Sequence, residues 1–191
     1  MTEYRTKDVL RVRDVSPEDI PVVNAYWKNQ TPADVERLSL DPSKITTRLL
    51  QPSALDELVK LPYPQRTNDL LIWELNERAV GMSSLRNIRY EEYGEIHLHM
   101  IEPQFRWSGY GHRFFVLSLQ EYVRRFSLKI IVCEPSSENP APNRLLQKLG
   151  FTIARTYRAT PSDINHEHQV NRYEIKPELM TGLGSWLSAP K

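Results

Sequence analysis

The sequence predicts a single domain of mixed α/β structure, on the evidence of its length, composition and hydrophobic spacing. A chain of 191 residues is long enough to bury a substantial core in one domain. Hydrophobic residues make up 40% of it and charged residues 26%, as in ordinary globular proteins. Apolar positions recur at helical spacing in the first third, and alternating strand-like and helical segments follow. We expect residues 1–176 to form the domain and residues 177–191 a C-terminal tail.

The composition excludes several classes of protein. The single cysteine, Cys133, rules out an internal disulfide framework, and no apolar run approaches the roughly 20 residues that span a bilayer. The polar opening residues lack the apolar core of a signal peptide. A formal net charge of +1 provides no broad positive field for nucleic acid. We therefore expect a cytoplasmic protein without membrane or nucleic-acid partners.

The N-terminal third is predicted to be a short strand followed by several short helices. Residues 9–14 alternate as a strand does. Three helix starts follow, each marked by a capping side chain directly before a proline. They are Ser16-Pro17, Thr31-Pro32 and Asp41-Pro42. Apolar residues at helical spacing come after them, as at Ile20, Val23 and Trp27.

The remainder of the chain is predicted to be mostly extended. Period-two spacing or short apolar runs predict strands at 70–75, 79–85, 95–101, 130–133, 151–157 and 170–175. Asn76 and Glu77 form the turn of a hairpin between the first two of these strands. Helical spacing through Phe126 predicts a long helix before residues 130–133, and Gly150 ends a later helix.

A glycine-containing loop separates the strand at 95–101 from the long helix. It reads Arg106, Trp107, Ser108, Gly109, Tyr110 and Gly111. Backbone N–H groups in such a turn, together with those of the helix start, form a concave site that suits a pyrophosphate. The loop is not a P-loop, and Phe114 stands where a dinucleotide fingerprint requires a third glycine. On its own the pattern also suits a simple tight turn.

Two separated motifs make the chain resemble a known family. The loop resembles the acyl-CoA loop of the GCN5-related N-acetyltransferase (GNAT) superfamily, which has an arginine or glutamine followed by spaced glycines. The later Asn139, Lys148, Gly150 and Phe151 are similar to the Asn through Lys-x-Gly-Phe motif of that family. The resemblance implies the GNAT fold, a mixed and mostly antiparallel sheet with flanking helices. It also implies that the third and fourth long strands splay apart to admit acyl-CoA.

The resemblance further implies an acyl-CoA-dependent N-acyltransferase. Acetyl-CoA, or another short acyl-CoA, would be the co-substrate, and a primary amine on a small molecule or a peptide would attack the thioester directly. Backbone groups near Met100 or Ile101 would hold the oxyanion, and the side chains of Arg106 and His112 would meet phosphates. The cofactor-binding residues implied are Met100, Ile101, Arg106, Trp107, Ser108, Gly109, Tyr110, Gly111, His112 and Asn139. A homodimer is possible.

The strand before the loop supplies candidates for a general base. Glu95, His97 and His99 share one face of it, because side chains alternate along a strand. An attacking alkylammonium has an ordinary pKa near 10.4 and must lose a proton, and histidine titrates closest to neutrality. His97 is the first choice, and Glu95 could share a water relay with it. Glu134 resembles an acid that attracts a cationic acceptor in related enzymes, although a plain strand-end turn is an equal alternative.

Other interpretations remain open. The pairs His97/His99 and His166/His168 could in principle bind a metal, but their spacing fits no standard zinc site, and we expect none. Leu146 stands where many relatives have a tyrosine that protonates the departing thiolate. Two later tyrosines, Tyr157 and Tyr173, are conceivable substitutes, with strand packing the better explanation. Because that role is vacant, a non-catalytic acyl-CoA sensor or scaffold is the alternative function.

Overall fold

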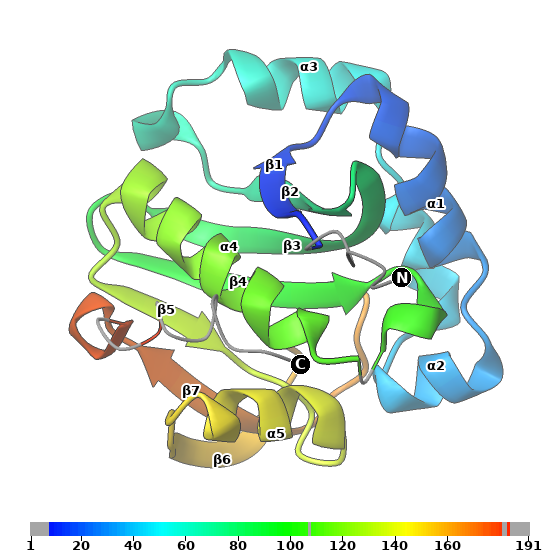
Figure 1. The fold of residues 1–191 in the computed structure, drawn as a ribbon. Coiled ribbons are helices and arrows are strands. Elements are labelled where there is room, and N and C mark those ends of the chain that lie inside the picture. The colour runs from blue at the N-terminus through cyan, green and yellow to red at the C-terminus, as the bar shows by residue number, and fades with distance from the viewer. Residues whose placement is uncertain (1–7, 107, 181–182, 184–191) are drawn as a thin grey trace, which may run out of the picture.

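The protein has a seven-stranded sheet with the strand order β1-β2-β3-β4-β5-β7-β6, shown in Figure 1. This computed structural model describes residues 8–106, 108–180 and 183. Neighbouring strands are antiparallel, apart from β4 and β5, which pair in parallel. The mixed α/β class with a mostly antiparallel sheet is therefore confirmed.

The elements follow the predicted order. The strands are β1 (Leu10–Asp14), β2 (Asp69–Leu75), β3 (Arg78–Arg89), β4 (Tyr93–Met100), β5 (Ile130–Cys133), β6 (Ile153–Ala159) and β7 (His168–Ile175). The α-helices are α1 (Ile20–Lys28), α2 (Pro32–Arg37), α3 (Pro52–Lys60), α4 (Tyr110–Phe126) and α5 (Pro140–Lys148). The 3-10 helices are η1 (Pro17–Asp19), η2 (Pro42–Arg48), η3 (Tyr63–Gln65), η4 (Pro103–Phe105) and η5 (Pro177–Met180).

The predicted helix starts are confirmed, with two differences. The backbone N–H of Ser16 donates to Asp19 at 2.8 Å, and the Thr31 hydroxyl caps α2. The segment after Asp41 is 3-10 rather than α-helical. The α3 helix was not predicted separately: it begins at Pro52, a residue that suits a first helical position, but Gln51 before it makes no side-chain capping bond.

One face of the sheet packs against α4, which crosses the front of the sheet in Figure 1. Phe115, Leu119 and Tyr122 of this helix are fully buried, and they form one core with Leu85 of β3 and Ile96 of β4. Burial of large apolar side chains on a regular helical face is what holds the helix to the sheet. Because Ile96 points toward α4, its neighbours His97 and Glu95 face the opposite side.

The N-terminal elements cover part of the opposite face. Val23 and Trp27 of α1 and Leu55 of α3 are buried against Ile72 and Met82 of the sheet. The two faces of one sheet thus hold separate hydrophobic clusters, and a third, smaller cluster includes Trp73 of β2 and Phe114 of α4. The short helices leave the end of β4 that carries the histidines only partly covered.

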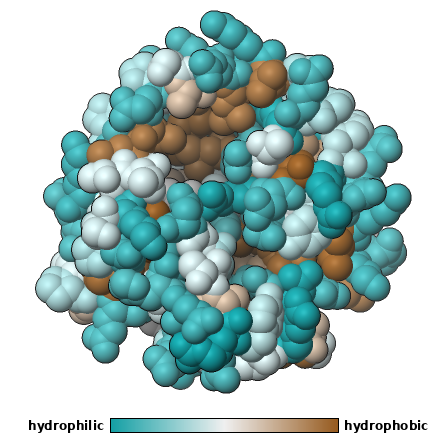
Figure 2. Space-filling model, turned by 180° about the vertical axis from the view of Figure 1, so that it is seen from behind, coloured by the Kyte–Doolittle hydropathy of each residue, from teal (hydrophilic) through white to brown (hydrophobic). Residues whose placement is uncertain are grey.

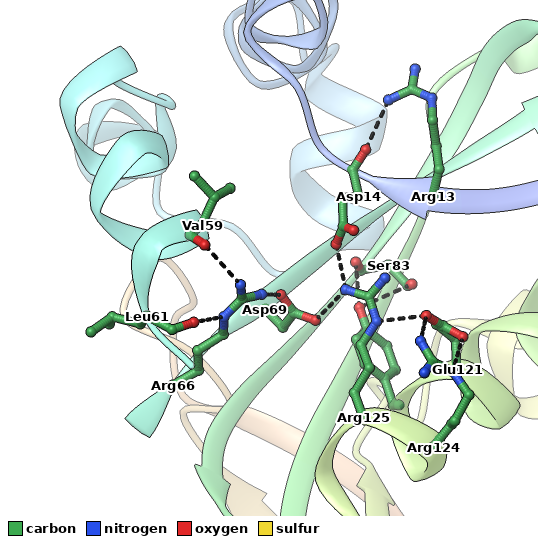
Figure 3. A network of polar contacts seen from close by, with 11 residues as sticks. Arg13, Asp14, Val59, Leu61, Arg66, Asp69, Ser83, Glu121, Arg124 and Arg125 are labelled. Carbon is green, nitrogen blue, oxygen red and sulfur yellow. Dashed lines mark hydrogen bonds and ion pairs between the residues drawn. The ribbon is translucent and has the colours of Figure 1, made fainter. Parts of the chain in front are cut away.

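A buried ionic network joins α4 to the strands (Figure 3). Arg125 of α4 contacts Asp14 of β1, donates to Asp69 of β2 at 3.0 Å, and donates to Glu121 at 2.7 Å. Arg66, which follows η3, binds the other oxygen of Asp69 at 3.0 Å. The side chains of Arg125 and Asp69 are only 4% and 2% exposed. The network therefore connects α4, two strands and the segment that leads out of α3.

The end of the chain is only partly described. The η5 segment follows β7. Leu183 is 3% exposed and belongs to the hydrophobic core that α4 forms with the sheet. Trp186, in the predicted tail, lies outside the described residues, and the boundary at residue 176 stays a prediction. Among the helices that the structure describes, none is long and apolar enough to cross a membrane.

Candidate active site

The β4 and β5 strands separate within the sheet. Their parallel pairing joins Tyr93 to Ile130 and ends where Glu95 meets Val132. β4 continues to Met100 without β5 beside it. A gap therefore opens between the two strands, as the resemblance implied, on the stretch of β4 that carries the histidines.

A cavity of about 500 Å³ lies at this gap. Three of the predicted site residues, His97, Glu134 and Asn139, line it together, and His99 does so as well. Figure 2 views the protein from the side opposite α4, where hydrophobic side chains line a hollow that hydrophilic side chains surround. The cavity is therefore a meeting point of β4, the segment after β5, and the start of α5.

Glu95 does not line the cavity. Asn87 donates to one of its carboxylate oxygens and the hydroxyl of Tyr93 to the other, both at 2.7 Å. Burial and this hydrogen bond raise the pKa of Tyr93 to about 12. Glu95 shares the face of His97, as predicted, but both of its oxygens already have protein donors.

His99 lies in an aromatic setting that the sequence did not indicate. A hydrogen bond of 3.0 Å joins its Nδ1 to the hydroxyl of Tyr26. Its ring packs edge-on against Trp27, with ring centroids 4.8 Å apart. Burial raises the pKa of Tyr26 to about 12, so this hydroxyl stays protonated at neutral pH. The sequence had placed Trp27 only on an apolar helix face, and it gave no sign of a contact so distant along the chain.

Glu134 is held by two donors rather than standing in solvent. Its Oε1 accepts from the Tyr157 hydroxyl at 2.5 Å and from Arg172 at 2.8 Å. The side chains of Glu134 and Arg172 are each 15% exposed. Burial and the hydrogen bond to Glu134 raise the pKa of Tyr157. Arg172 is a site neighbour that sequence reasoning missed.

Asn139 lines the cavity and carries a buried acceptor without a partner in the described part of the chain. It is 6% exposed and precedes α5, but it makes no side-chain capping bond. Its buried Oδ1 has no hydrogen-bond partner among the described residues. A buried amide oxygen without a donor is costly. An N–H donor from a ligand would remove this cost.

The predicted pyrophosphate loop leads directly into α4. Gly109 has φ +86°, in the left-handed region that favours glycine, and it is the residue before the helix. A Cβ on Gly111 would meet Leu145 of α5 at 3.7 Å, so the helix start lies beside α5. The Ser108 hydroxyl donates to the carbonyl of Phe105 at 2.5 Å and closes the preceding turn. Trp107 lies outside the described residues.

Arginine and lysine side chains lie around this loop. Burial, followed by the nearby charges of Lys148 and Arg113, lowers the pKa of His112 below 6.5. Arg106 forms an ion pair of 3.2 Å with Asp34 of α2, a carboxylate that also binds Arg37 at 2.7 Å. The start of α4 thus combines a helix N-terminus with several cationic groups, a combination that favours an anion.

The remaining predicted residues fall into two groups. Met100 is partly buried against a small core cluster, and the backbone N–H of Ile101 donates to the carbonyl of Val80 at 3.0 Å. Which backbone group would hold an oxyanion stays a prediction. The tyrosine Tyr110 is 5% exposed, so it would meet a ligand through its backbone.

Several alternatives from the sequence have structural explanations. Leu146 is fully buried in the core and Tyr173 donates to Asn143 at 3.0 Å. Burial raises the pKa of Cys133, the single cysteine, to about 12, so it stays a thiol at neutral pH. In the part of the chain that the structure describes, no three His, Cys, Asp or Glu side chains converge as metal ligands would.

The chain matches a family model described as an acetyltransferase (GNAT) domain over residues 10–152. The matched segment runs from β1 through β4, the glycine loop and α5. The chain therefore belongs to the GNAT family, and it is an N-acetyltransferase. No curated protein sequence matches it significantly.

Solved structures of acetyltransferases share the fold. A spermidine N-acetyltransferase from Vibrio cholerae, in complex with CoA and spermine, has a TM-score of 0.68 at 18% identity, over 90% of this chain and 97% of the other. A ribosomal L7/L12 alpha-N-protein acetyltransferase with CoA has 0.67 at 18%, over 87% and 93%. A putative acetyltransferase from Salmonella typhimurium with acetyl-CoA has 0.61 at 17%, over 88% and 94%. The ligands of these proteins agree with the acyl-CoA co-substrate that the sequence predicts.

Proposed function

We propose that this N-acetyltransferase moves an acetyl or short acyl group from acyl-CoA to a primary amine of a small molecule or peptide by direct attack. The observation that supports this proposal most is the parting of β4 and β5 beside a cavity with His97 on one wall and Asn139 on the other. Such a gap lets a thioester and an amine meet away from bulk water, which favours aminolysis over hydrolysis.

In the proposed reaction His97 accepts a proton from the amine. That proton is the one the ammonium form of the acceptor loses, which frees the nitrogen lone pair. The nitrogen then forms a bond to the thioester carbon, the carbon–sulfur bond breaks and the thiolate leaves, and the acylated nitrogen gives its second proton to solvent. A thiol has an ordinary pKa near 8.5, so this thiolate is a tolerable leaving group and solvent can protonate it. This chain needs no tyrosine at the position of Leu146 for that step. Glu95, with both oxygens occupied, is assigned a supporting electrostatic role.

Acyl-CoA binding is assigned to the start of α4 and the start of α5. We propose that backbone N–H groups from Gly109 to His112 hold the pyrophosphate, with Arg106 released from Asp34 to meet a phosphate. Asn139 would accept a hydrogen bond from an amide of the pantetheine arm. Glu134 would orient the acceptor amine, although its ion pair with Arg172 reduces the charge that it offers.

Thiol release from acetyl-CoA in the presence of an amine panel tests the reaction. We expect release that depends on both acetyl-CoA and the amine. The vacant tyrosine position favours one alternative, a sensor that binds acyl-CoA without turnover. Thermal stabilisation by acetyl-CoA, with no thiol release for any amine, would support the sensor and reject the enzyme.

Substitution of Gly109 by alanine is expected to raise the KM for acetyl-CoA about tenfold, because a Cβ disfavours φ +86° and displaces the loop. Gly150 provides a matched control, since its φ is +88° and a Cβ there would meet nothing within 4 Å. Gly150→Ala should suffer similar backbone strain, visible as a lower melting temperature, but should keep its KM. Equal KM values in both variants would contradict the loop assignment.

The pKa of His112 should report phosphate binding. Burial and neighbouring cations hold it below 6.5 in the unliganded protein. A bound pyrophosphate brings negative charge, which favours the imidazolium and raises the pKa. NMR titration of the His112 ring with and without CoA measures this change. A pKa that is the same in both states, at saturating CoA, would place the pyrophosphate elsewhere.

A further inference from the structure

The cavity beside His97 is lined by both apolar and polar side chains. Apolar side chains from the N-terminal elements and the sheet form most of its wall, among them Val23, Trp27, Leu50, Leu55 and Leu58. The histidines of β4, Glu134 and Asn139 add polar groups to the same lining. An occupant that satisfies both kinds of group has a hydrophobic body and a polar head.

Every carboxylate that the described lining contributes is already paired with an arginine. The lining carboxylates are Asp69, Glu134 and Asp163. Asp69 is bound by Arg66 and Arg125, Glu134 by Arg172, and Asp163 by Arg86. The cavity wall also includes Arg37, which is itself paired with Asp34.

These pairs disfavour an acceptor with several positive charges. An ammonium group that enters a cavity loses water and needs a carboxylate in exchange. Taking Asp69 for this purpose would strip a 2% exposed carboxylate from its arginine partners, and breaking such a buried pair is costly. Charge and shape therefore point to the same class of ligand.

We propose that the acceptor is a monoamine with an apolar body, whose amino group lies beside His97 and whose body packs against the apolar side chains of the cavity wall. This inference rests on the proposed function, because it names the substrate class of the same site. It distinguishes this chain from the structural relative that is a spermidine N-acetyltransferase. The selectivity follows from the arginine partners of the cavity carboxylates, none of which was indicated by the sequence.

A direct comparison of two amines by thiol release tests the proposal. With acetyl-CoA fixed, kcat/KM for 2-phenylethylamine should exceed that for spermidine at least tenfold. Ala54→Glu would place a carboxylate on the cavity wall, from an exposed position of α3 where glutamate suits the helix. The Ala54→Glu variant should shift the ratio of the two kcat/KM values about tenfold in favour of spermidine. Val59→Glu on the same helix is the control, because Val59 is 49% exposed and does not line the cavity.

The outcomes separate this inference from the proposed function. Equal or faster acetylation of spermidine would overturn the monoamine class, while amine-dependent thiol release would still uphold the enzyme. An equal shift in the Ala54 and Val59 variants would also overturn it, since surface charge alone would then explain the preference. If no amine releases thiol, the enzyme proposal fails. Calorimetry then decides the ligand class: binding of 2-phenylethylamine that Ala54→Glu weakens supports it, and no binding overturns it.

Discussion

Replacement of His97 by alanine is expected to lower kcat/KM for the amine about 100-fold, the lower end of what a general base contributes. His97 lines the cavity at the point where β4 has lost its partner strand. Without an imidazole there, the fraction of free amine at neutral pH limits the rate. The loss should therefore shrink as the pH rises toward the pKa of the amine. Thiol release measured from pH 6 to pH 10 gives this profile.

Two further variants test the assignment of His97 as the general base. His166→Ala is the matched control, because His166 is exposed and does not line the cavity, and we expect it to keep full activity. Glu95→Gln should cost much less than His97→Ala, since Glu95 lies outside the cavity lining with both oxygens bonded. Activity that survives in the His97 variant and disappears in the Glu95 variant would reverse the two roles.

The local features of this fold were readable from the sequence. Period-two alternation placed Glu95, His97 and His99 on one strand face, and the register with β3 confirms it. Capping residues before prolines marked the helix starts, and Gly109 and Gly150 stand where the backbone has positive φ. Each of these signals depends on residues a few positions apart, which is the range over which hydrogen bonding and sterics act along a chain.

The features of the site that the sequence did not indicate all depend on contacts between residues that are far apart in the chain. Tyr26 meets His99, Asp34 meets Arg106 and Arg172 meets Glu134, and the two members of each pair lie on different elements. No periodicity encodes such contacts, because the packing of the sheet brings them together. The gap between β4 and β5 is likewise a property of register, and it was expected only through resemblance to a family.

The ion pairs of the cavity show why contacts between distant residues matter for predicting function. The sequence indicated Glu134 as an acid that could attract a cationic acceptor, and the pairing with Arg172 changes that interpretation. A carboxylate attracts a ligand cation only to the extent that no protein cation already neutralises it. Substrate charge therefore has to be judged from the ion pairs of the folded protein, which a list of acidic residues does not give.

The largest effect on stability is expected at Arg125. Arg125→Met should lower the free energy of unfolding by about 3–5 kcal/mol, the usual loss when one member of a buried ion pair is removed. The side chain is 4% exposed and serves Asp14, Asp69 and Glu121 at once (Figure 3). Methionine preserves the length of the aliphatic chain, so the loss reports the missing charge. Urea unfolding with an unchanged m-value measures it.

Arg124→Met is the matched control on the same turn of α4. Arg124 also binds Glu121, but its side chain is 65% exposed, and an exposed pair contributes at most about 1 kcal/mol. Equal decreases in the free energy of unfolding in the two variants would show that burial does not set the contribution of these ion pairs. Burial already raises the pKa of Asp69 above its ordinary value, and loss of Arg125 should raise it further. The folded variant then binds a proton that the unfolded chain releases, so its deficit should grow as the pH rises and shrink as Asp69 becomes protonated.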